Sequence, residues 1–593
     1  MMTDYKYPLN DAYLATDLRD LLRNSVRKFG DTAAFKIKDE RVLGKKVKFD
    51  RRGLPKRASK YIDVSYAKYA DDVNRLGQIM MTEFGKDIKV AIISETRYEW
   101  YVSYLATVNG LGVVIPLDNE LPEEEVMNLL QRSEADVIIF SGNRAEMIAN
   151  IREQVPSLKH FVAMDQKKTA DSDYYFWDLL EVGVATSFVG SYINQEIDAQ
   201  KMSVLLFTSG TTAGSKAVML SHNNLCDNIY NMLRLVQVTN EDTLLSVLPL
   251  HHTYESTCGF LAALSVGATI SVCDGLRYIV NNLQESKATV ILVVPLMLQA
   301  FHKKIWKQAM ASLVTKYSFL SMLKISDMMV KVGFDKRKVF FKKIHSTFGG
   351  YLRMIICGGA PVEAQYIKDF ETLGFTCFQG YGLTECSPIL ALNRDQYSNP
   401  ASAGLPMPGT EIKLINTDEN GIGEVIAKSS SVMLGYYRDE AKTKEVIDED
   451  GYFHTGDYGY FDENGFLILT GRKANIIVTA NGKNIFPEEL EFLLSEYDIV
   501  QEVVVTGKRN DKDEVELFAY IYPNMEFVEK VPELTKSKID SLELRAAISD
   551  VIKQVNKRVS HYKHIKDFAI RTTEFEKTTT KKIKRRLVEQ DKQ

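Results

Sequence analysis

The stretch VLLFTSGTTAGSKAVMLSH, residues 204–222, joins an apolar run to a loop of Ser, Thr and Gly that leads to a single lysine, Lys216. An apolar run of this kind is typical of a strand covered on both faces. Hydroxyls and closely approaching backbone amides in such a loop can surround phosphate oxygens, and a lysine adds a point charge. A Walker A loop requires GxxxxGK(S/T), and this loop differs from it in spacing and order. We therefore expect a phosphate-binding loop of a different class, with a plain polar turn as the alternative.

Similar runs rich in β-branched residues recur from residue 88 onward and alternate with longer segments of helical period. Apolar strands separated by helices indicate a parallel sheet covered by helices on both faces. The predicted fold class is therefore α/β, with parallel or mixed sheets in a large N-terminal domain. The runs are IKVAIIS (88–94), ADVIIFS (135–141), MSVLLFTS (202–209), TLLSVLPL (243–250), ATVILVVP (288–295) and YLRMIICGG (351–359).

Short alternating strands and turns replace this pattern between residues 403 and 470, with Glu-Asn-Gly turn signals at 419–421 and 463–465. This texture predicts a small antiparallel β-subdomain. A new mixture of strands and an amphipathic helix begins after residue 472. We expect one domain at 1–472, which includes the β-subdomain, and a smaller α+β domain at 473–593.

The composition fits a large globular protein, since 45% of the 593 residues are hydrophobic and 26% are charged. A net charge of -4 gives no sign of a nucleic-acid partner. The six cysteines include no CxxC pair, which favours reduced thiols and a cytoplasmic location. We expect no signal peptide and no membrane span, because the most apolar long run has 14 residues, fewer than the roughly 18 to 20 required.

The loop is the first of a series of motifs, which lie along the chain in this order: TSGTTAGSK (208–216), PLHHTYE (249–255), GGAP (358–361), YGLTE (381–385), TGD (455–457), GRKANIIVTANGKNIFPEELE (471–491) and KTTTKKIKR (577–585). Together they resemble the motifs of the adenylate-forming superfamily, and they are most similar to those of bacterial long-chain fatty acid CoA ligases. The resemblance implies an enzyme that uses ATP and Mg²⁺ to activate a medium- to long-chain fatty acid as an acyl-adenylate, releasing pyrophosphate. Coenzyme A would then displace AMP.

The resemblance also implies which residues hold the nucleotide. Glu385 would hold Mg²⁺, because a hard cation suits one carboxylate together with substrate phosphates, and Thr384 would touch the α-phosphate. Asp457 would accept hydrogen bonds from the ribose hydroxyls, and Arg472 would reach the ribose and phosphate region. The residues by themselves also allow a helix N-cap at Thr384, a buried turn Asp and a surface Arg. The β- and γ-phosphates would be bound by Thr208, Ser209, Gly210, Thr211, Thr212 and Lys216, and adenine by Gly359, Ala360, Pro361 and Tyr381.

Catalysis and domain motion are implied at other positions. Lys582 would bridge the carboxylate and the α-phosphate and offset their repulsion, with a solvated basic tail as the alternative. His252 would be a gate between the ATP and acyl sites, with a core histidine as the alternative. We expect His251 and His252 to project differently, which argues against a zinc site. The small domain would rotate about Ala474, so that Lys582 serves adenylation and the face with Gly482 serves thioester formation.

The chain departs from the family pattern at a few positions. Because Gly214 and Lys216 remain, we expect ATP binding to be kept, whereas the rate of domain alternation and the geometry of the last loop stay open. The departures are Ala213, Ser215 and Ala217 in place of Gly, Pro and Gly, Ala474 in place of a polar hinge residue, and Lys581 in place of Gly.

The segment 301–345 carries 11 Lys or Arg against 2 Asp, a net charge of +9, and its apolar residues recur at helical spacing. It resembles the extra helical segment of long-chain ligases. One interpretation is peripheral contact with the inner face of an anionic membrane, or guidance of acyl chains and CoA phosphates. The other is a solvated helical hairpin whose apolar face packs on the core.

Alternatives to a CoA ligase stay open at this point. One is acyl transfer to the thiol of an acyl carrier protein, and another is a non-catalytic acyl- or nucleotide-binding regulator, which the altered loop and hinge motivate. A peptide-synthetase adenylation domain is less favoured, because PLHHTYE lacks the Asp that would hold an amino group. Chain length and oligomeric state do not follow from the sequence.

Overall fold

The computed structural model describes residues 5–50, 54–165, 172–182, 189–208, 215–478, 484–509, 515–531, 534, 538–539, 541–577 and 583–590. It divides into two compact units. The first comprises residues 1–411, 427–453 and 463–467, and the second comprises residues 412–426, 454–462 and 468–593. The predicted β-subdomain at 403–470 is therefore divided between the two units, and the domain boundary at residue 472 stays a prediction.

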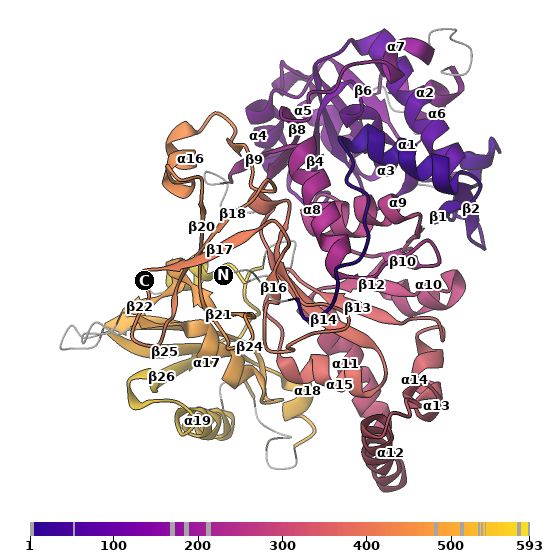
Figure 1. Ribbon diagram of the computed structural model, residues 1–593. Helices are drawn as coiled ribbons and strands as arrows, with labels where there is room; N and C mark the ends of the chain where they lie inside the picture. Colours follow the sequence, from indigo (N-terminus) through magenta and orange to yellow (C-terminus); the bar gives the residue numbers. More distant parts are fainter. Residues whose placement is uncertain are drawn as a thin grey trace. The chain divides into compact units, whose positions relative to one another are not determined.

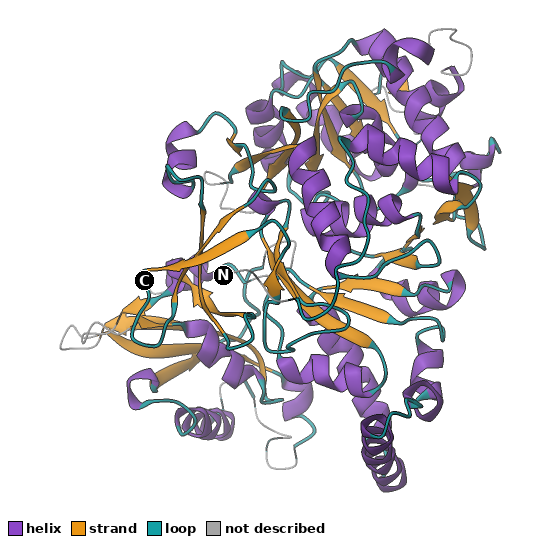
Figure 2. Ribbon diagram, viewed as in Figure 1, coloured by secondary structure: helices purple, strands orange, loops and turns teal. Residues whose placement is uncertain are grey.

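The first unit contains two large mixed sheets flanked by helices (Figures 1 and 2). One sheet has the order β16-β15-β14-β13-β12-β10-β11-β1-β2, and its interior strands from β1 to β14 run parallel, with antiparallel pairs at both edges. Its strands are β1 (Ala33–Ile37), β2 (Ile62–Ser65), β10 (Thr243–Ser246), β11 (Thr269–Val272), β12 (Val290–Val293), β13 (Met354–Cys357), β14 (Thr376–Gly382), β15 (Ile389–Leu392) and β16 (Leu405–Pro406).

The other sheet has the order β19-β9-β8-β4-β3-β5-β6-β7, in which β8 to β7 run parallel and β9 and β19 are added antiparallel. The predicted α/β class with parallel and mixed sheets is confirmed. The strands are β3 (Ile88–Ile93), β4 (Gly112–Leu117), β5 (Val137–Phe140), β6 (His160–Ala163), β7 (Tyr174–Tyr175), β8 (Met202–Phe207), β9 (Ala217–Ser221) and β19 (Gly435–Tyr436).

Helices cover both sheets because their apolar faces need burial. Val126 and Leu129 of α4 pack with Ile148 of α5 against strands of the second sheet. A capping box starts α8 directly after β9, since the amide of Asn224 donates to the hydroxyl of Ser221 at 3.2 Å. The helices are α1 (Leu18–Phe29), α2 (Tyr66–Phe84), α3 (Tyr98–Val108), α4 (Glu123–Ser133), α5 (Ala145–Ile151), α6 (Phe176–Val182), α7 (Val189–Ile193), α8 (His222–Leu235), α9 (Ala262–Val266), α10 (Ile279–Ser286), α11 (Pro295–Ala309), α12 (Leu313–Lys331), α13 (Arg337–Phe340), α14 (Lys342–Thr347), α15 (Ala364–Thr372) and α16 (Glu440–Val446).

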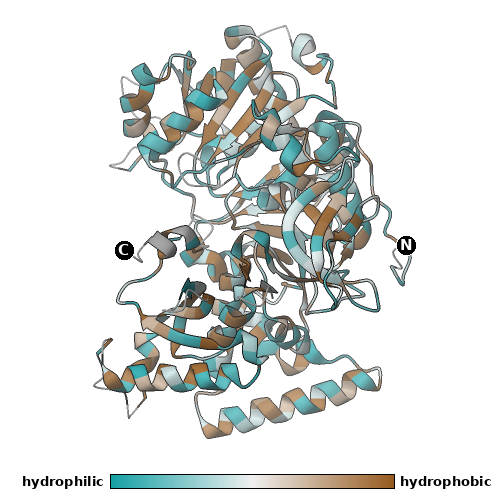
Figure 3. Ribbon diagram, turned by 90° about the vertical axis from the view of Figure 1, so that its left-hand side faces the viewer, coloured by the Kyte–Doolittle hydropathy of each residue, from teal (hydrophilic) through white to brown (hydrophobic). Residues whose placement is uncertain are grey.

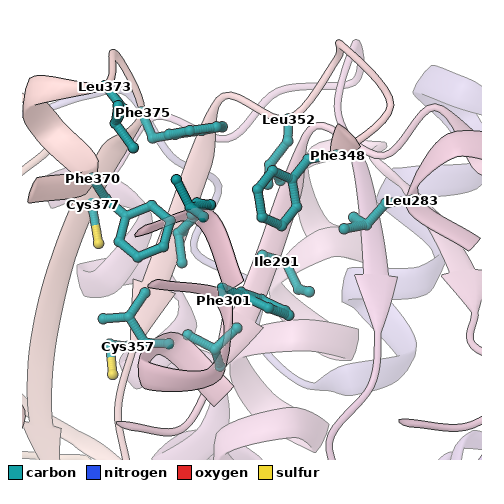
Figure 4. Close-up of a cluster of buried hydrophobic side chains, with 14 of the residues drawn as sticks. Leu283, Ile291, Phe301, Phe348, Leu352, Cys357, Phe370, Leu373, Phe375 and Cys377 are labelled. Carbon is teal, nitrogen blue, oxygen red and sulfur yellow. The ribbon is translucent and has the colours of Figure 1, made fainter. Parts of the chain in front are cut away.

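A buried apolar cluster fills the space between the first sheet and helices α10, α11, α14 and α15 (Figure 4). Phe348 lies at its centre, with its ring edge-on to those of Phe301 and Phe375 at centroid distances of 5.5 and 5.8 Å. Figure 3 shows the same partition over the described residues, with hydrophobic residues concentrated on the strands and hydrophilic residues frequent on the helices.

The second unit contains a sheet in the order β17-β18-β20-β21 and a smaller one in the order β24-β25-β26, with α17 and α19 packed on the latter. Gly421 and Gly465 both have positive φ, of 74° and 81°, as the predicted turns require. Its elements are β17 (Glu411–Ile415), β18 (Gly423–Lys428), β20 (Phe453–Phe461), β21 (Leu467–Arg472), β22 (Ile477–Val478), β23 (Asn484–Ile485), α17 (Pro487–Ser495), β24 (Val500–Arg509), β25 (Val515–Pro523), α18 (Met525–Val528), α19 (Leu542–Asn556), β26 (Ile565–Ile570) and α20 (Arg585–Gln590).

Candidate active site

The candidate phosphate-binding loop is the connection of a β-hairpin. Strands β8 and β9 pair up to Phe207 and Ala217, and the amide of Thr208 then donates to the carbonyl of Lys216 at 3.0 Å. This pair closes the neck of the loop. The candidate residues Ser209, Gly210, Thr211 and Thr212 lie outside the described residues, as does Gly214.

Arg132 of α4 holds the neck from one side. Its two terminal nitrogens donate to the hydroxyl and to the carbonyl of Ser215, at 2.6 and 2.7 Å. The same guanidinium lies over the ring of Phe207 at 5.4 Å. Ser215 stands where the adenylate-forming pattern commonly has Pro. A proline ring would stiffen the backbone there, and in this chain the bidentate contact from Arg132 supports the backbone instead.

Tyr436 lies on the other side and joins two candidate residues. The Nζ of Lys216 donates to the hydroxyl of Tyr436 at 3.1 Å, and that hydroxyl donates to Oε1 of Glu385 at 2.9 Å. Glu385 is 9% exposed, and burial raises the pKa of Tyr436 far above its ordinary value. The fold thus brings the loop lysine and the candidate metal carboxylate together around one phenol.

The carboxylate of Glu385 fits a hard cation. Tyr436 is its hydrogen-bond donor at Oε1, and no described residue donates a hydrogen bond to Oε2. The neighbouring Thr384 begins a short 3-10 helix, Thr384–Cys386, whose N-cap is Leu383. One carboxylate that keeps a coordinating oxygen suits Mg²⁺, which takes its remaining ligands from phosphates and water.

The candidate adenine site lies at the carboxyl ends of two adjacent parallel strands. Cys357, the last residue of β13, pairs with Gln379 of β14, so Gly359, two residues past the end of β13, and Tyr381, two residues further along β14, lie at the same edge of the sheet. Tyr381 is 9% exposed. Gly359 has a φ of +84°, a conformation that favours glycine, and it forms a bend with Ala360 directly before Pro361. This arrangement can place a flat base against backbone and ring.

His252 precedes a π-helix, Tyr254–Leu261, and π-helical turns are frequent at functional sites. The hydroxyl of Tyr254 donates to the carbonyl of Ile356 in β13 at 2.9 Å, which ties this segment to the strand that leads to Gly359. Glu255 is buried, and its Oε1 accepts a hydrogen bond from the hydroxyl of Ser246 at 2.5 Å. Burial raises the pKa of Glu255 to about 8.

The expectation that His251 and His252 project differently is wrong. Their ring centroids are 4.1 Å apart because residues 249–252 form a turn, in which the amide of His252 donates to the carbonyl of Pro249. Burial lowers the pKa of His251 to about 3. Among the described residues there is still no group of three or more His, Cys, Asp or Glu side chains that could hold a metal ion.

In the second unit, Nε of Arg472 lies 2.9 Å from Oδ1 of Asp457. Asp457 lies in β20 and is 5% exposed, and its amide donates to the hydroxyl of Thr455 at 3.0 Å, which fixes the strand backbone around it. The expected hinge residue Ala474 lies in a 3-10 helix, Lys473–Asn475. Gly482, Lys581 and Lys582 lie outside the described residues.

Sequence reasoning passed over Arg132 and Tyr436. Neither belongs to a short motif of the loop. Arg132 is 83 residues from its partner Ser215 in the sequence, and Tyr436 is 220 residues from its partner Lys216. The six cysteines are free and buried, as the reduced state predicts. None of the helices that the structure describes combines the length and the hydropathy needed to cross a bilayer.

A hairpin loop that ends in a lysine, a buried carboxylate close to it and a left-handed glycine after a parallel strand make this an α/β protein with a candidate nucleotide site. The chain belongs to the AMP-binding enzyme family: residues 40–437 match the family model, and residues 474–592 match that of the AMP-binding enzyme C-terminal domain. The adenylate-forming superfamily expected from the motifs is thereby confirmed.

Individual relatives agree with this assignment. The chain is similar to long-chain-fatty-acid–CoA ligase 5 of Rattus norvegicus, with 30% identity over 485 residues that cover 77% of this chain and 71% of the relative. It is also similar to the chloroplastic long-chain-fatty-acid–acyl-carrier-protein ligase AEE15 of Arabidopsis thaliana, with 27% identity over 543 residues that cover 79% and 74%. In fold it is similar to ATP-bound MatB from Rhodopseudomonas palustris, with a TM-score of 0.72, 20% identity and coverage of 97% and 99%. These findings support an ATP-dependent acyl-CoA or acyl-carrier-protein ligase.

Proposed function

We propose that this chain activates a medium- to long-chain fatty acid with ATP and transfers it to coenzyme A. The observation that carries the proposal is the contact chain from Lys216 through Tyr436 to Glu385, because it gathers a phosphate ligand and a metal ligand beside the loop. Bound Mg²⁺ would neutralise phosphate charge during the reaction.

Two steps make up the proposed reaction. An oxygen of the fatty acid carboxylate forms a bond to the α-phosphorus of ATP, and the bond from that phosphorus to the bridging oxygen breaks, so pyrophosphate leaves. The CoA sulfur then bonds to the acyl carbon, AMP leaves with the bond electrons, and the thiol proton passes to solvent. Lys216 and the loop hold the β- and γ-phosphates, and Lys582 holds the α-phosphate and the carboxylate, so that two anions are aligned at low repulsion.

The nucleoside end is assigned to the remaining candidates. Tyr381 stacks on adenine against the backbone of Gly359–Pro361, and Asp457 accepts hydrogen bonds from the ribose, with Arg472 beside it. His252 separates the ATP site from the acyl site. In the second step, rotation about Ala474 replaces the Lys582 face of the small domain with the Gly482 face.

A direct assay decides which thiol accepts the acyl group. The rat relative is named a CoA ligase and the Arabidopsis relative an acyl-carrier-protein ligase. Purified protein is incubated with ATP, Mg²⁺ and acids of 8 to 18 carbons, and with either free CoA or a holo-carrier protein. We expect acyl-CoA with CoA and little acylated carrier. The reverse preference would make the carrier protein the acceptor, and neither product would favour a non-catalytic binding protein.

We also propose that helix α12 rests on an anionic membrane surface in the cytoplasm. One face of α12 packs on the core through Phe319, which is 4% exposed. The opposite face carries an apolar stripe of Val314, Tyr317, Ile325 and Met328, spaced by three, eight and three residues, and Val332 continues it directly after the helix ends; their exposures run from 46% to 79%. An exposed second stripe of this kind favours contact with another apolar surface over a solvated hairpin.

The positive charge around this stripe indicates which kind of surface the stripe contacts. Lys316, Lys324, Lys336 and Lys338 are exposed and form no ion pair with any residue that the structure describes. A second copy docked on the same stripe would bring two basic segments together, whereas an anionic bilayer accepts both the lysines and the apolar side chains. Within the first unit, helix α12 lies at the lower end in Figure 1.

Vesicle sedimentation tests the membrane contact. The wild type should sediment with vesicles that contain phosphatidylglycerol, sediment less with pure phosphatidylcholine, and be released by high salt. Tyr317→Asp with Met328→Asp should reduce binding by roughly tenfold or more. Leu542→Asp, at a position of α19 that is 81% exposed, is the matched control and should bind like the wild type. Equal binding of all three proteins would exclude α12 as the contact.

A further inference from the structure

The hydroxyl of Tyr436 lies between two oppositely charged side chains, those of Lys216 and Glu385. A lysine ammonium can only donate hydrogen bonds and an ionised carboxylate can only accept them, whereas a phenol does one of each. The 3.1 Å contact from Lys216 and the 2.9 Å contact to Glu385 use both capacities. The ammonium also lies over the ring at 4.9 Å from its centroid.

The backbone fixes Tyr436 in this position from several directions. Strand β19 pairs antiparallel with β9, so that Tyr436 faces Val218, two residues after the loop lysine. The amide of Tyr437 donates to the carbonyl of Ala217 at 2.8 Å, and the amide of Met433 donates to the carbonyl of Glu385 at 2.8 Å. The segment 433–437 is therefore bonded both to the strand that leaves the loop and to the residue that carries the carboxylate.

We propose that Tyr436 is a positioning residue that couples the loop lysine to the metal-binding carboxylate. The inference rests on the proposed function, in which Lys216 meets the phosphates and Glu385 meets Mg²⁺. The phenol engages Oε1 of Glu385 and so orients the other carboxylate oxygen, and it holds the ammonium at a set distance from that carboxylate. Without the hydroxyl, the two opposite charges are free to pair directly, which would withdraw both from the nucleotide and the cation.

Tyr436→Phe tests this role against a matched control, Tyr437→Phe. The Tyr437 hydroxyl belongs to the next residue and accepts a hydrogen bond from Nζ of Lys89 at 2.8 Å. Binding of ATP is measured by calorimetry at several Mg²⁺ concentrations, and ATP–pyrophosphate exchange gives KM and kcat. We expect Tyr436→Phe to weaken ATP binding and the apparent Mg²⁺ affinity by roughly tenfold, with a smaller change in kcat. Tyr437→Phe should match the wild type.

A double-mutant cycle supplies a readout that a merely structural role would not move. Lys216→Met should cost much less ATP affinity in the Tyr436→Phe background than in the wild type, because the two residues act together. Additive effects, or equal behaviour of the two phenylalanine variants, would overturn the coupling. Thermal unfolding without ligand identifies any variant that is misfolded. Should Tyr436→Phe misfold, ATP affinities of Lys216→Met, Glu385→Gln and the double variant test the same coupling with Tyr436 intact.

Failure of the coupling and failure of the proposed function give different results. Wild-type protein that exchanges pyrophosphate while Tyr436→Phe matches the control would overturn the coupling alone. Wild-type protein that binds ATP with Mg²⁺ but never exchanges would overturn the ligase proposal, and calorimetry would still decide the coupling. Wild-type protein that does not bind ATP would overturn both.

Discussion

Arg132 donates two hydrogen bonds to Ser215, one to the side-chain hydroxyl at 2.6 Å and one to the backbone carbonyl at 2.7 Å. The contact lies at the neck of the candidate phosphate-binding loop, directly before Lys216. A fork-shaped donor that meets two acceptors of one residue fixes that residue in orientation as well as in place. The chain thus stabilises the loop from α4 at the position where a proline is common in the family.

Arg132→Lys keeps the positive charge and removes the fork. We expect KM for ATP in pyrophosphate exchange to rise by roughly threefold to tenfold, because one or two charge-assisted hydrogen bonds are lost from the loop. Arg438→Lys is the control, since Arg438 is a 62% exposed side chain paired with Glu134. An unchanged KM in Arg132→Lys would contradict a supporting role for the fork.

Asp457→Ala tests the ribose assignment through the nucleotide itself. If the carboxylate accepts a hydrogen bond from a ribose hydroxyl, the wild type should prefer ATP to 2′-deoxyATP by about tenfold in kcat/KM, and the variant should lose most of that preference. Glu463→Ala, in an exposed turn of the same sheet, should keep it. A variant that loses activity but keeps the full preference would show that Asp457 does not contact the ribose.

Glu255→Gln tests the buried carboxyl of the π-helix through the pH dependence of stability. Burial raises the pKa of Glu255 from 4.5 to about 8, so between these values the folded chain keeps a proton that the unfolded chain releases. Stability therefore falls as pH rises through this window. A glutamine at this position cannot ionise, so the free energy of unfolding of the variant should decline less from pH 5 to pH 8, by on the order of 2 to 5 kcal/mol.

Urea unfolding at several pH values provides the measurement for Glu255→Gln. The amide can still accept the hydrogen bond from Ser246, so the variant should fold. Glu463→Gln, at an exposed position, is the control and should follow the wild-type curve. Parallel curves for the wild type and Glu255→Gln would mean that the carboxyl is not protonated in the folded chain.

Much of the fold follows from local patterns in the sequence. The apolar runs that begin near Ile88, Val137 and Val290 form parallel strands, because strands buried on both faces need apolar side chains throughout. The turns at Gly421 and Gly465 follow from the need for positive φ. These features depend only on residues close together along the chain.

The support around the candidate site could not be predicted in this way. The contact of Lys216 with Tyr436 depends on the register of β19 against β9, and the contact of Arg132 with Ser215 depends on how α4 packs on the sheet. No periodicity in the sequence encodes either. The side-by-side rings of His251 and His252 were likewise missed, because a local turn and not a strand sets their directions.

Fatty-acid-dependent ATP–pyrophosphate exchange tests the central claim most directly. With Mg²⁺ and a panel of acids of 8 to 18 carbons, the wild type should exchange label into ATP, and omission of acid or of Mg²⁺ should abolish the exchange. Lys582→Ala should reduce exchange by roughly a hundredfold or more, while the neighbouring Lys581→Ala should retain it. Folded wild-type protein that liberates and exchanges no pyrophosphate with any acid would contradict the account.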